Sequence, residues 1–353
     1  MTSPNVMPAP LKDFCCAILQ KAGATPAHAE IIAETLVAAN LSGIDTHGVL
    51  RLKIYATRIE KKVVNTNPDA IHILKESPTT CLIDGADSPG QIIGVMAMKK
   101  AIALAKKSGI GIVAVRNSNN FGAAGYYAVK PLACDMIGMV CCESGPNLAP
   151  FGAAEAGLGN NPIAIAIPAG TYPPLVLDMA MSVVAAGKIR KASKEGKSIP
   201  EGWVIDSDGL PTTDPLVYTE RRGYLVPVGA HKGSGLAIMV SLLAGALTGP
   251  IFGKNVGRAF SLENPGHVGH LFAALRIDNF CDPAEYRQRV DERIRSLKSC
   301  RPAKGVQEIL FPGEKEARTR KERLEKGIPL SANLLKELKE LGTTWEVKFP
   351  PSA

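Results

Sequence analysis

Apolar residues recur three or four positions apart through much of the N-terminal region, which is the spacing of amphipathic helices. Gly23 ends the first such pattern, and Thr25 followed by Pro26 is typical of the start of the next helix. The pattern predicts helices over residues 11–22, 26–41 and 49–61.

Beyond residue 80, short apolar runs alternate with further helical patterns. The runs predict strands over residues 81–83, 110–115, 137–142, 162–167, 175–177 and 269–277. Helices are expected over residues 91–107, 123–133, 183–192, 236–247, 283–297, 315–326 and 331–341. This alternation predicts an α/β fold. Neither an internal repeat nor a flexible linker is evident, so the expected domains are interleaved.

The composition is that of a folded globular protein, with 353 residues, 46% hydrophobic and 21% charged. The net charge is +8, but basic residues are dispersed and only 5% of residues are aromatic, so nucleic-acid binding is the weaker reading. The charge favours anionic substrates or a phosphate-bearing cofactor. No signal-peptide pattern is present, and the longest apolar window, residues 235–247, is too short to span a bilayer. A cytoplasmic protein with no membrane partner is expected.

The eight cysteines form no Cys-x-x-Cys pair, and several lie in apolar runs. This usage predicts reduced thiols in a reducing compartment. His267 and His270 are three residues apart, but no acidic or sulfur ligand adjoins them. A structural role is expected for both, and no metal site is predicted.

Candidate chemistry is concentrated in residues 41–52, Leu-Ser-Gly-Ile-Asp-Thr-His-Gly-Val-Leu-Arg-Leu. Asp45 or Thr46 is the expected N-cap of the following helix, with His47 at its tip and Arg51 on the same side. A guanidinium can hold a carboxylate through two hydrogen bonds, and an imidazole can move a proton near neutral pH. The plainer alternative is a capped helix start with an exposed arginine.

Asp178 follows the predicted strand 175–177. It either caps the next helix or orients His47, as a third group orients the base in catalytic triads. Other strand ends carry small-residue loops, which let backbone amides approach an anionic ligand or simply make tight turns. The chain contains no Gly-x-Gly-x-x-Gly after a strand, no P-loop and no Gly-x-Ser-x-Gly.

Motifs along most of the chain resemble the malate/L-lactate dehydrogenase family, which is unrelated to the classical Rossmann lactate dehydrogenases. The matching segments are residues 45–51, 90–91, 118–127, 160–164, 177–180, 200–203, 231–233 and 311–314. The resemblance implies a family-specific NAD(P)-binding fold without the Rossmann fingerprint, and a homodimer with the active site near the interface. Residues 1–117, completed by 300–353, would form an N-terminal helical, substrate-side region. Residues 118–299 would form the cofactor-binding region of the same catalytic unit.

By the same resemblance, His47 is the proton donor to a carbonyl or imine and Arg51 holds the substrate carboxylate. Thr46 stands where the family often has serine, with Asp178 as the relay partner. The cofactor would be NAD or NADP. The residues implied to line it are Ser144, Asp178, Met179, Ala180, Lys232, Gly233, Pro312, Gly313 and Glu314.

Two positions depart from the family pattern. Asn120 replaces a histidine that is assigned as the catalytic base in the ureidoglycolate branch, and Ser234 replaces a common aromatic residue. Asparagine cannot take up a proton, but it can donate hydrogen bonds to a substrate and accept them from it. Either His47 does the acid–base work in this chain, or the protein is catalytically impaired.

These features predict an NAD(P)-dependent oxidoreductase that transfers a hydride between nicotinamide and C2 of a small 2-oxo or 2-hydroxy acid, similar to malate or lactate. One alternative is a reductase of cyclic 2-imino acids, which needs the same carboxylate anchor and the same acid. Another is a family member that binds the cofactor without turnover.

Overall fold

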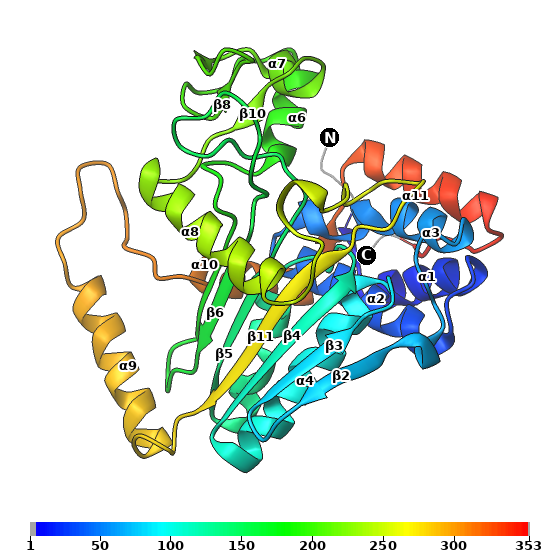
Figure 1. The fold of residues 1–353 in the computed structure, drawn as a ribbon. Helices are drawn as coiled ribbons and strands as arrows, with labels where there is room; N and C mark the ends of the chain where they lie inside the picture. The colour runs from blue at the N-terminus through cyan, green and yellow to red at the C-terminus, as the bar shows by residue number, and fades with distance from the viewer. Residues whose placement is uncertain (1–4, 352–353) are drawn as a thin grey trace.

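A seven-stranded mixed sheet forms the centre of the chain in the computed structural model, which describes residues 5–351 (Figure 1). The strand order is β2-β3-β4-β11-β5-β6-β7. These strands are β2 (His72–Glu76), β3 (Thr80–Asp84), β4 (Ile110–Ser118), β5 (Met136–Cys142), β6 (Ile163–Ile167), β7 (Leu175–Met179) and β11 (Val268–Arg276). Within this sheet β3 and β4 are parallel and the other neighbours are antiparallel. The predicted α/β class is confirmed.

Helices cover both faces of the sheet. The crossover between the parallel strands β3 and β4 is α4 (Gly90–Ser108), which packs an apolar side against one face and ends at Gly109, whose φ is +84°. On the opposite face lie α8 (His231–Ser241) and the π-helical turn Leu242–Ala246 that continues it. The sheet is therefore a rigid support whose strand ends can hold a site.

A separate helical core is built from both ends of the chain. The helices α1 (Pro8–Lys21), α2 (Pro26–Leu41), α3 (Leu52–Glu60) and α11 (Ala332–Thr344) share it. The strands β1 (Asn5–Val6) and β12 (Ile328–Pro329) pair antiparallel beside it. Thr25 caps α2 by accepting from the backbone N–H of His28 at 3.3 Å, which confirms the predicted start. The division into substrate-side and cofactor-binding regions remains a prediction.

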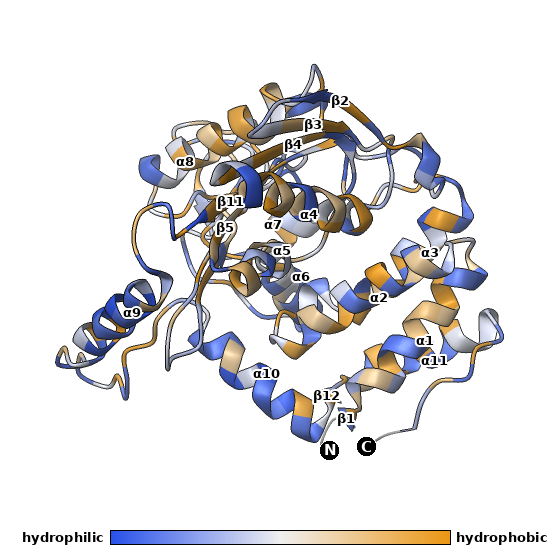
Figure 2. Cartoon of the chain, turned by 90° about the horizontal axis from the view of Figure 1, so that it is seen from below, coloured by the Kyte–Doolittle hydropathy of each residue, from blue (hydrophilic) through white to orange (hydrophobic). Residues whose placement is uncertain are grey.

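The remaining elements lie around the sheet. They are the helices α5 (Gly125–Ala128), α6 (Ala186–Lys194), α7 (Pro215–Thr219), α9 (Pro283–Lys298) and α10 (Glu314–Lys326), and the small sheet of β8 (Val204–Ile205), β9 (Pro211–Thr212) and β10 (Tyr224–Leu225). Figure 2 shows α9 as a mainly hydrophilic arm that stands away from the body. None of the described helices is both long enough and apolar enough to cross a membrane.

The single helix predicted over residues 123–133 is wrong. The segment forms the short α5 and then a 3-10 turn, Lys130–Cys134, because Pro131 has no N–H with which to continue an α-helix. Asp178 lies within β7 and not after it, since the strand continues to Met179. The edge strand β2 and the small sheet were not predicted, because each is short and lacks a strong alternating pattern.

Candidate active site

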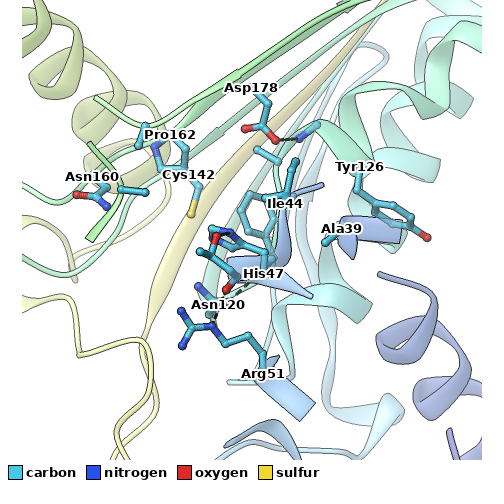
Figure 3. Close-up of a pocket in the computed structure, with 18 of the residues that line it drawn as sticks. Ala39, Ile44, His47, Arg51, Asn120, Tyr126, Cys142, Asn160, Pro162 and Asp178 are labelled. Atoms are coloured by element: carbon cyan, nitrogen blue, oxygen red, sulfur yellow. Dashed lines mark hydrogen bonds between the residues drawn. The ribbon is translucent and has the colours of Figure 1, made fainter. Parts of the chain in front are cut away.

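One cleft of about 2320 Å³ collects most of the residues implicated by the sequence. Its walls come from the segment after α2, the loop after β4, the ends of β5 and β7, and the turn before α10. The predicted residues that line it are Thr46, His47, Arg51, Asn120, Ser144, Asp178, Ala180, Pro312 and Gly313. Figure 3 shows His47, Arg51 and Asn120 side by side, with Asp178 and Cys142 farther along the walls.

The segment that carries His47 and Arg51 is not the predicted capped helix. It forms two successive 3-10 turns, Asp45–His47 and Val49–Arg51, and α3 begins only at Leu52. Neither Asp45 nor Thr46 caps a helix with its side chain, so that prediction is wrong.

Buried Asn40, at the end of α2, holds this segment in place instead. Its Oδ1 accepts from the backbone N–H of Val49 at 2.8 Å, and its Nδ2 donates to Asp45 at 2.6 Å. Arg323 of α10 also donates to Asp45, at 2.6 and 3.1 Å. Contacts from nearby Asn40 and from the distant Arg323 therefore replace the expected cap, and they fix the direction in which His47 projects.

His47 is a neutral imidazole at neutral pH in this environment. Burial, reinforced by the nearby charge of Arg51, lowers the pKa of His47 to about 4. Its Nδ1 lies 3.1 Å from the hydroxyl oxygen of Thr46. When the Thr46 hydroxyl donates to Nδ1, the proton of the neutral ring is on Nε2. Thr46 then determines which ring nitrogen can exchange a proton with a ligand.

Arg51 is anchored at one end and free at the other. Its Nε donates to the backbone carbonyl of Thr46 at 2.8 Å, and neither terminal amino group has a hydrogen-bond partner among residues 5–351. The side chain forms no ion pair with a described carboxylate. Two parallel donors aimed into a cleft suit a carboxylate ligand.

Asp178 lies in the same cleft, but its recorded contact is with a backbone amide. Its Oδ2 accepts from the N–H of Gly125 at 2.7 Å, and no hydrogen bond joins it to His47 in the described structure (Figure 3). Burial raises the pKa of Asp178 to about 6, while the Gly125 N–H opposes this shift and Glu316 adds to it. The predicted orienting role remains a prediction, and it has no direct hydrogen bond in this conformation.

Four of the residues implied to bind a cofactor do not line the cleft: Met179, Lys232, Gly233 and Glu314. Lys232 is exposed at the start of α8, and Gly233 is buried beside it. Buried Glu314 accepts from Lys298 at 2.8 Å, from Arg318 and from the N–H of Phe311. Glu314 therefore stabilises the Pro312-Gly313 turn without lining the cleft.

The cleft has unfilled acceptors and cations that fit a nicotinamide dinucleotide. Asn147 Oδ1 and Asn160 Oδ1 are buried in its walls and have no hydrogen-bond donor within residues 5–351. A carboxamide or a ribose hydroxyl could supply those donors. Arg190, Arg258 and Arg320 also line the cleft, and none is paired with a described carboxylate. The volume is larger than a small acid alone requires.

The two histidines considered as a metal pair have separate structural contacts. His270 is fully buried, with Nε2 2.9 Å from the hydroxyl oxygen of Ser118, and it stacks on Phe121 with ring centroids 4.5 Å apart. His267 Nδ1 lies 2.9 Å from Asp87 Oδ1. Within residues 5–351 no three His, Cys, Asp or Glu side chains are grouped as a metal ion would require.

The fold is that of a dehydrogenase. The sequence profile described as malate/L-lactate dehydrogenase matches residues 6–339, and the chain belongs to that family. It is 41% identical to the malate dehydrogenase of Pyrococcus abyssi over 345 residues, which cover 96% of this chain and 94% of that one. It is 31% identical to the ureidoglycolate dehydrogenase (NAD(+)) of Escherichia coli K12, over 94% of this chain and 95% of that one.

Solved structures agree with this assignment. The sulfolactate dehydrogenase of Methanocaldococcus jannaschii matches with a TM-score of 0.90 and 39% identity, covering 98% of both chains. The delta1-piperideine-2-carboxylate reductase of Pseudomonas syringae matches with a TM-score of 0.84 and 28% identity, over 96% of this chain and 99% of that one.

Several residues of the site were missed from the sequence. Tyr55 follows Arg51 by four positions, so helical spacing could have placed it on the same side. Asn160 lies in the segment 160–164 that resembles the family, but no local feature indicates a role for its side chain. Arg190 and Phe260 reach the cleft from distant segments, and no local pattern marks either one.

Proposed function

We propose that this protein is an NAD(P)-dependent oxidoreductase that transfers a hydride between nicotinamide and C2 of a small 2-hydroxy acid or its 2-oxo partner. The observation that carries the proposal is the convergence of His47 and Arg51 in one cleft, where one side chain can move a proton and the other can hold a carboxylate. Membership of the dehydrogenase family supports the reaction type.

Arg51 and His47 have separate roles in the proposed reaction. Arg51 holds the substrate carboxylate with its free terminal amino groups, and this places C2 and its oxygen beside His47. Neutral His47 takes the hydroxyl proton in oxidation and returns a proton to the oxygen in reduction. A bound nicotinamide supplies or accepts the hydride. Burial is the larger cause of the low pKa of His47, and the charge of Arg51 is the second. A carboxylate bound to Arg51 offsets this second cause and so raises the pKa of His47.

The cofactor is proposed to lie along Ser144, Ala180 and the Pro312-Gly313 turn, with the unpaired acceptors of Asn147 and Asn160 available to it. A relative's name includes NAD(+), and both NAD and NADP are retained for this chain. Met179, Lys232, Gly233 and Glu314 remain proposed members of this region although they lie outside the cleft wall.

A substrate with a second anionic group is favoured by Arg190. This residue lines the cleft. Burial is the main cause that lowers the pKa of Arg51, and the charge of Arg190 adds to this shift, so the two guanidinium groups act on the same region. Relatives are named for malate and sulfolactate, each of which carries two anionic groups. We therefore place 2-hydroxy acids with a second carboxylate or a sulfonate ahead of lactate.

A screen of the purified protein tests the proposal. Reduced NAD and reduced NADP are offered with 2-oxo acids and with cyclic 2-imino acids, and loss of absorbance by the reduced cofactor is followed. Turnover of a 2-oxo acid that His47→Ala abolishes, with cofactor binding retained, is the expected result. Imine reduction alone would favour the reaction named for the Pseudomonas syringae reductase. Tight cofactor binding without any turnover would favour a non-catalytic role.

A homodimer in the cytoplasm is also proposed. Exposed apolar side chains follow α8 and the turn after it: Leu236, Ile238, Met239, Leu242, Leu243 and Leu247, each between 40% and 61% exposed. An apolar surface of this kind is typical of an interface, and a second copy is the proposed occupant. The eight free cysteines fit a reducing compartment. Light scattering of the purified protein, with Met239→Lys as the disrupting variant, tests the dimer.

A further inference from the structure

We propose that Asn120 donates a hydrogen bond from its side-chain N–H to the C2 oxygen of the substrate, and that Tyr55 is the positioning residue that fixes this donor. The inference rests on the proposed function, and it assigns a role to the residue that replaces the family histidine. The role is to stabilise charge on the oxygen, while the proton itself comes from His47.

The carboxamide of Asn120 has only one orientation that satisfies its neighbours. Its Oδ1 accepts from the hydroxyl of Tyr55 at 2.6 Å and from the backbone N–H of Gly122 at 3.3 Å. With Oδ1 engaged on this side, Nδ2 remains, and no acceptor for it is present within residues 5–351. Asn120 lines the cleft next to His47 and Arg51 (Figure 3). The unpaired N–H group is therefore the part of the side chain that is available to a ligand.

Tyr55 is suited to hold the amide at every working pH. It lies on α3, four residues after Arg51, and is buried. Burial raises the pKa of Tyr55 to about 12, although the charge of Arg51, the side chain of Gln91 and the charge of Arg58 oppose this shift. The hydroxyl thus stays protonated and donates to Asn120 Oδ1. The same helix start positions the carboxylate anchor and, through Tyr55, the proposed oxygen donor.

The backbone at Asn120 is fixed independently. A Cβ on Gly90 would lie 2.2 Å from the carbonyl oxygen of Asn119, so only glycine lets α4 approach this loop. The side chain of Asn119 donates to the Asp87 carbonyl at 2.8 Å and accepts from Arg58 at 2.9 Å. A donor held this firmly needs no reorganisation when charge develops next to it.

The chemistry requires such a donor. As the hydride reaches C2 in reduction, the carbonyl electron pair moves to the oxygen, and His47 then supplies the proton that completes the hydroxyl group. The Asn120 N–H forms a hydrogen bond to that oxygen throughout and neither gains nor loses a proton. The contribution of Asn120 therefore has no pH dependence of its own, whereas a histidine at this position would titrate.

Steady-state kinetics of three variants test the inference on the best 2-oxo acid of the screen. Asn120→Ala is expected to lower kcat about 10²- to 10³-fold, the usual effect of losing one oxyanion donor, with a much smaller change in KM. Tyr55→Phe keeps the ring and is expected to lower kcat about tenfold, since a misoriented donor loses only part of this effect. Because Tyr55 acts through Asn120, the double variant should be no slower than Asn120→Ala alone.

Tyr127→Phe is the matched control. It also removes a fully buried tyrosine hydroxyl, one that donates to the carbonyl of Phe121, but it leaves Asn120 Oδ1 untouched. Its kcat should stay within about twofold of wild type, and any loss of thermal stability should resemble that of Tyr55→Phe. Multiplicative losses in the double variant, or full kcat in Asn120→Ala, overturn the inference. A wild-type protein that turns over no 2-oxo acid instead overturns the proposed function.

Discussion

The guanidinium carbon of Arg51 lies 4.3 Å from the centroid of the Phe260 ring. Since Thr46 already holds Nε, the ring and the carbonyl together fix the plane of the guanidinium and leave its terminal amino groups to a ligand. Phe260 belongs to a loop between the π-helical turn and β11, so a segment distant in sequence completes the carboxylate site.

Phe260→Ala should therefore weaken substrate binding more than catalysis. Loss of a cation–π contact of about 0.5–2 kcal/mol predicts a KM about 2- to 30-fold higher, with kcat changed less than about twofold. Phe260→Tyr keeps the aromatic face and should retain the wild-type KM. An equal rise of KM in both variants would mean that the ring does not act through Arg51.

Proton transfer should give different pH profiles in the two directions of the reaction. Because the pKa of His47 is about 4, the free enzyme holds the neutral base above pH 5, and protonation of His47 should not limit kcat/KM for oxidation from there to pH 8. A step near pH 6 in this profile would report Asp178, whose pKa is about 6. Reduction uses the protonated ring, so its kcat/KM should fall about tenfold per pH unit over the same interval.

Replacing the neighbouring charge should move this profile. Arg51 is the second cause of the low pKa of His47, after burial, and its charge opposes protonation of the ring. Arg51→Gln should shift the acid limb of the oxidation profile to higher pH, although activity is lower throughout. Initial rates at constant ionic strength measure this shift. An unmoved limb in Arg51→Gln would remove His47 as the titrating group.

The order of helices and strands follows from periodicity and end signals, and the structure confirms most of it. Helix α4 illustrates why: its apolar stripe and the left-handed Gly109 are both local properties of the sequence. Segment 41–52 shows the limit. Its conformation depends on Asn40 and on Arg323, the latter far away in the chain, and these contacts override the local capping preference of Asp45 and Thr46.

The residues of the site likewise fall into those that local sequence could identify and those that it could not. His47 and Arg51 were found because they are close in sequence and carry distinctive chemistry. Tyr55 follows Arg51 at helical spacing, but in the sequence it resembles an ordinary core residue, because its partner Asn120 is 65 residues away. Arg190 and Phe260 could be found only after folding brought α6 and the loop before β11 to the cleft.

Asp178 should make the protein less stable at neutral pH. Its pKa is about 6 in the fold, raised above the ordinary 3.8 mainly by burial, so its contribution to stability is present below pH 3.8 and is lost as pH rises through 6. Asp178→Asn should then be more stable than wild type at pH 8, by up to about 3 kcal/mol, with the difference shrinking toward pH 4. Urea unfolding at several pH values measures the difference.

Asp291→Asn is a control for which the opposite change in stability is expected. Burial raises the pKa of Asp291, but hydrogen bonds from Thr171 and Gly170 outweigh this effect and hold it below 3.8. The carboxylate of Asp291 therefore stabilises the fold above pH 3.8, and this contribution is lost as pH falls through its lowered pKa. Its substitution should destabilise the protein at pH 8. If both variants moved in the same direction there, the burial argument for Asp178 would fail.

Selectivity between substrates should depend on Arg190. Lys191 is the next residue on α6, but it faces Glu195 at 3.8 Å and does not line the cleft, so Lys191→Met controls for loss of a surface charge. Arg190→Met should lower kcat/KM for a dicarboxylate such as oxaloacetate by about 10- to 100-fold, the usual range for a charge-assisted contact. The value for pyruvate should change less than about threefold, since pyruvate has no second anion for Arg190 to hold. Equal losses on both substrates would show that Arg190 acts on the shared carboxylate or on the cofactor, and the preference for a second anionic group would then have no basis in this cleft.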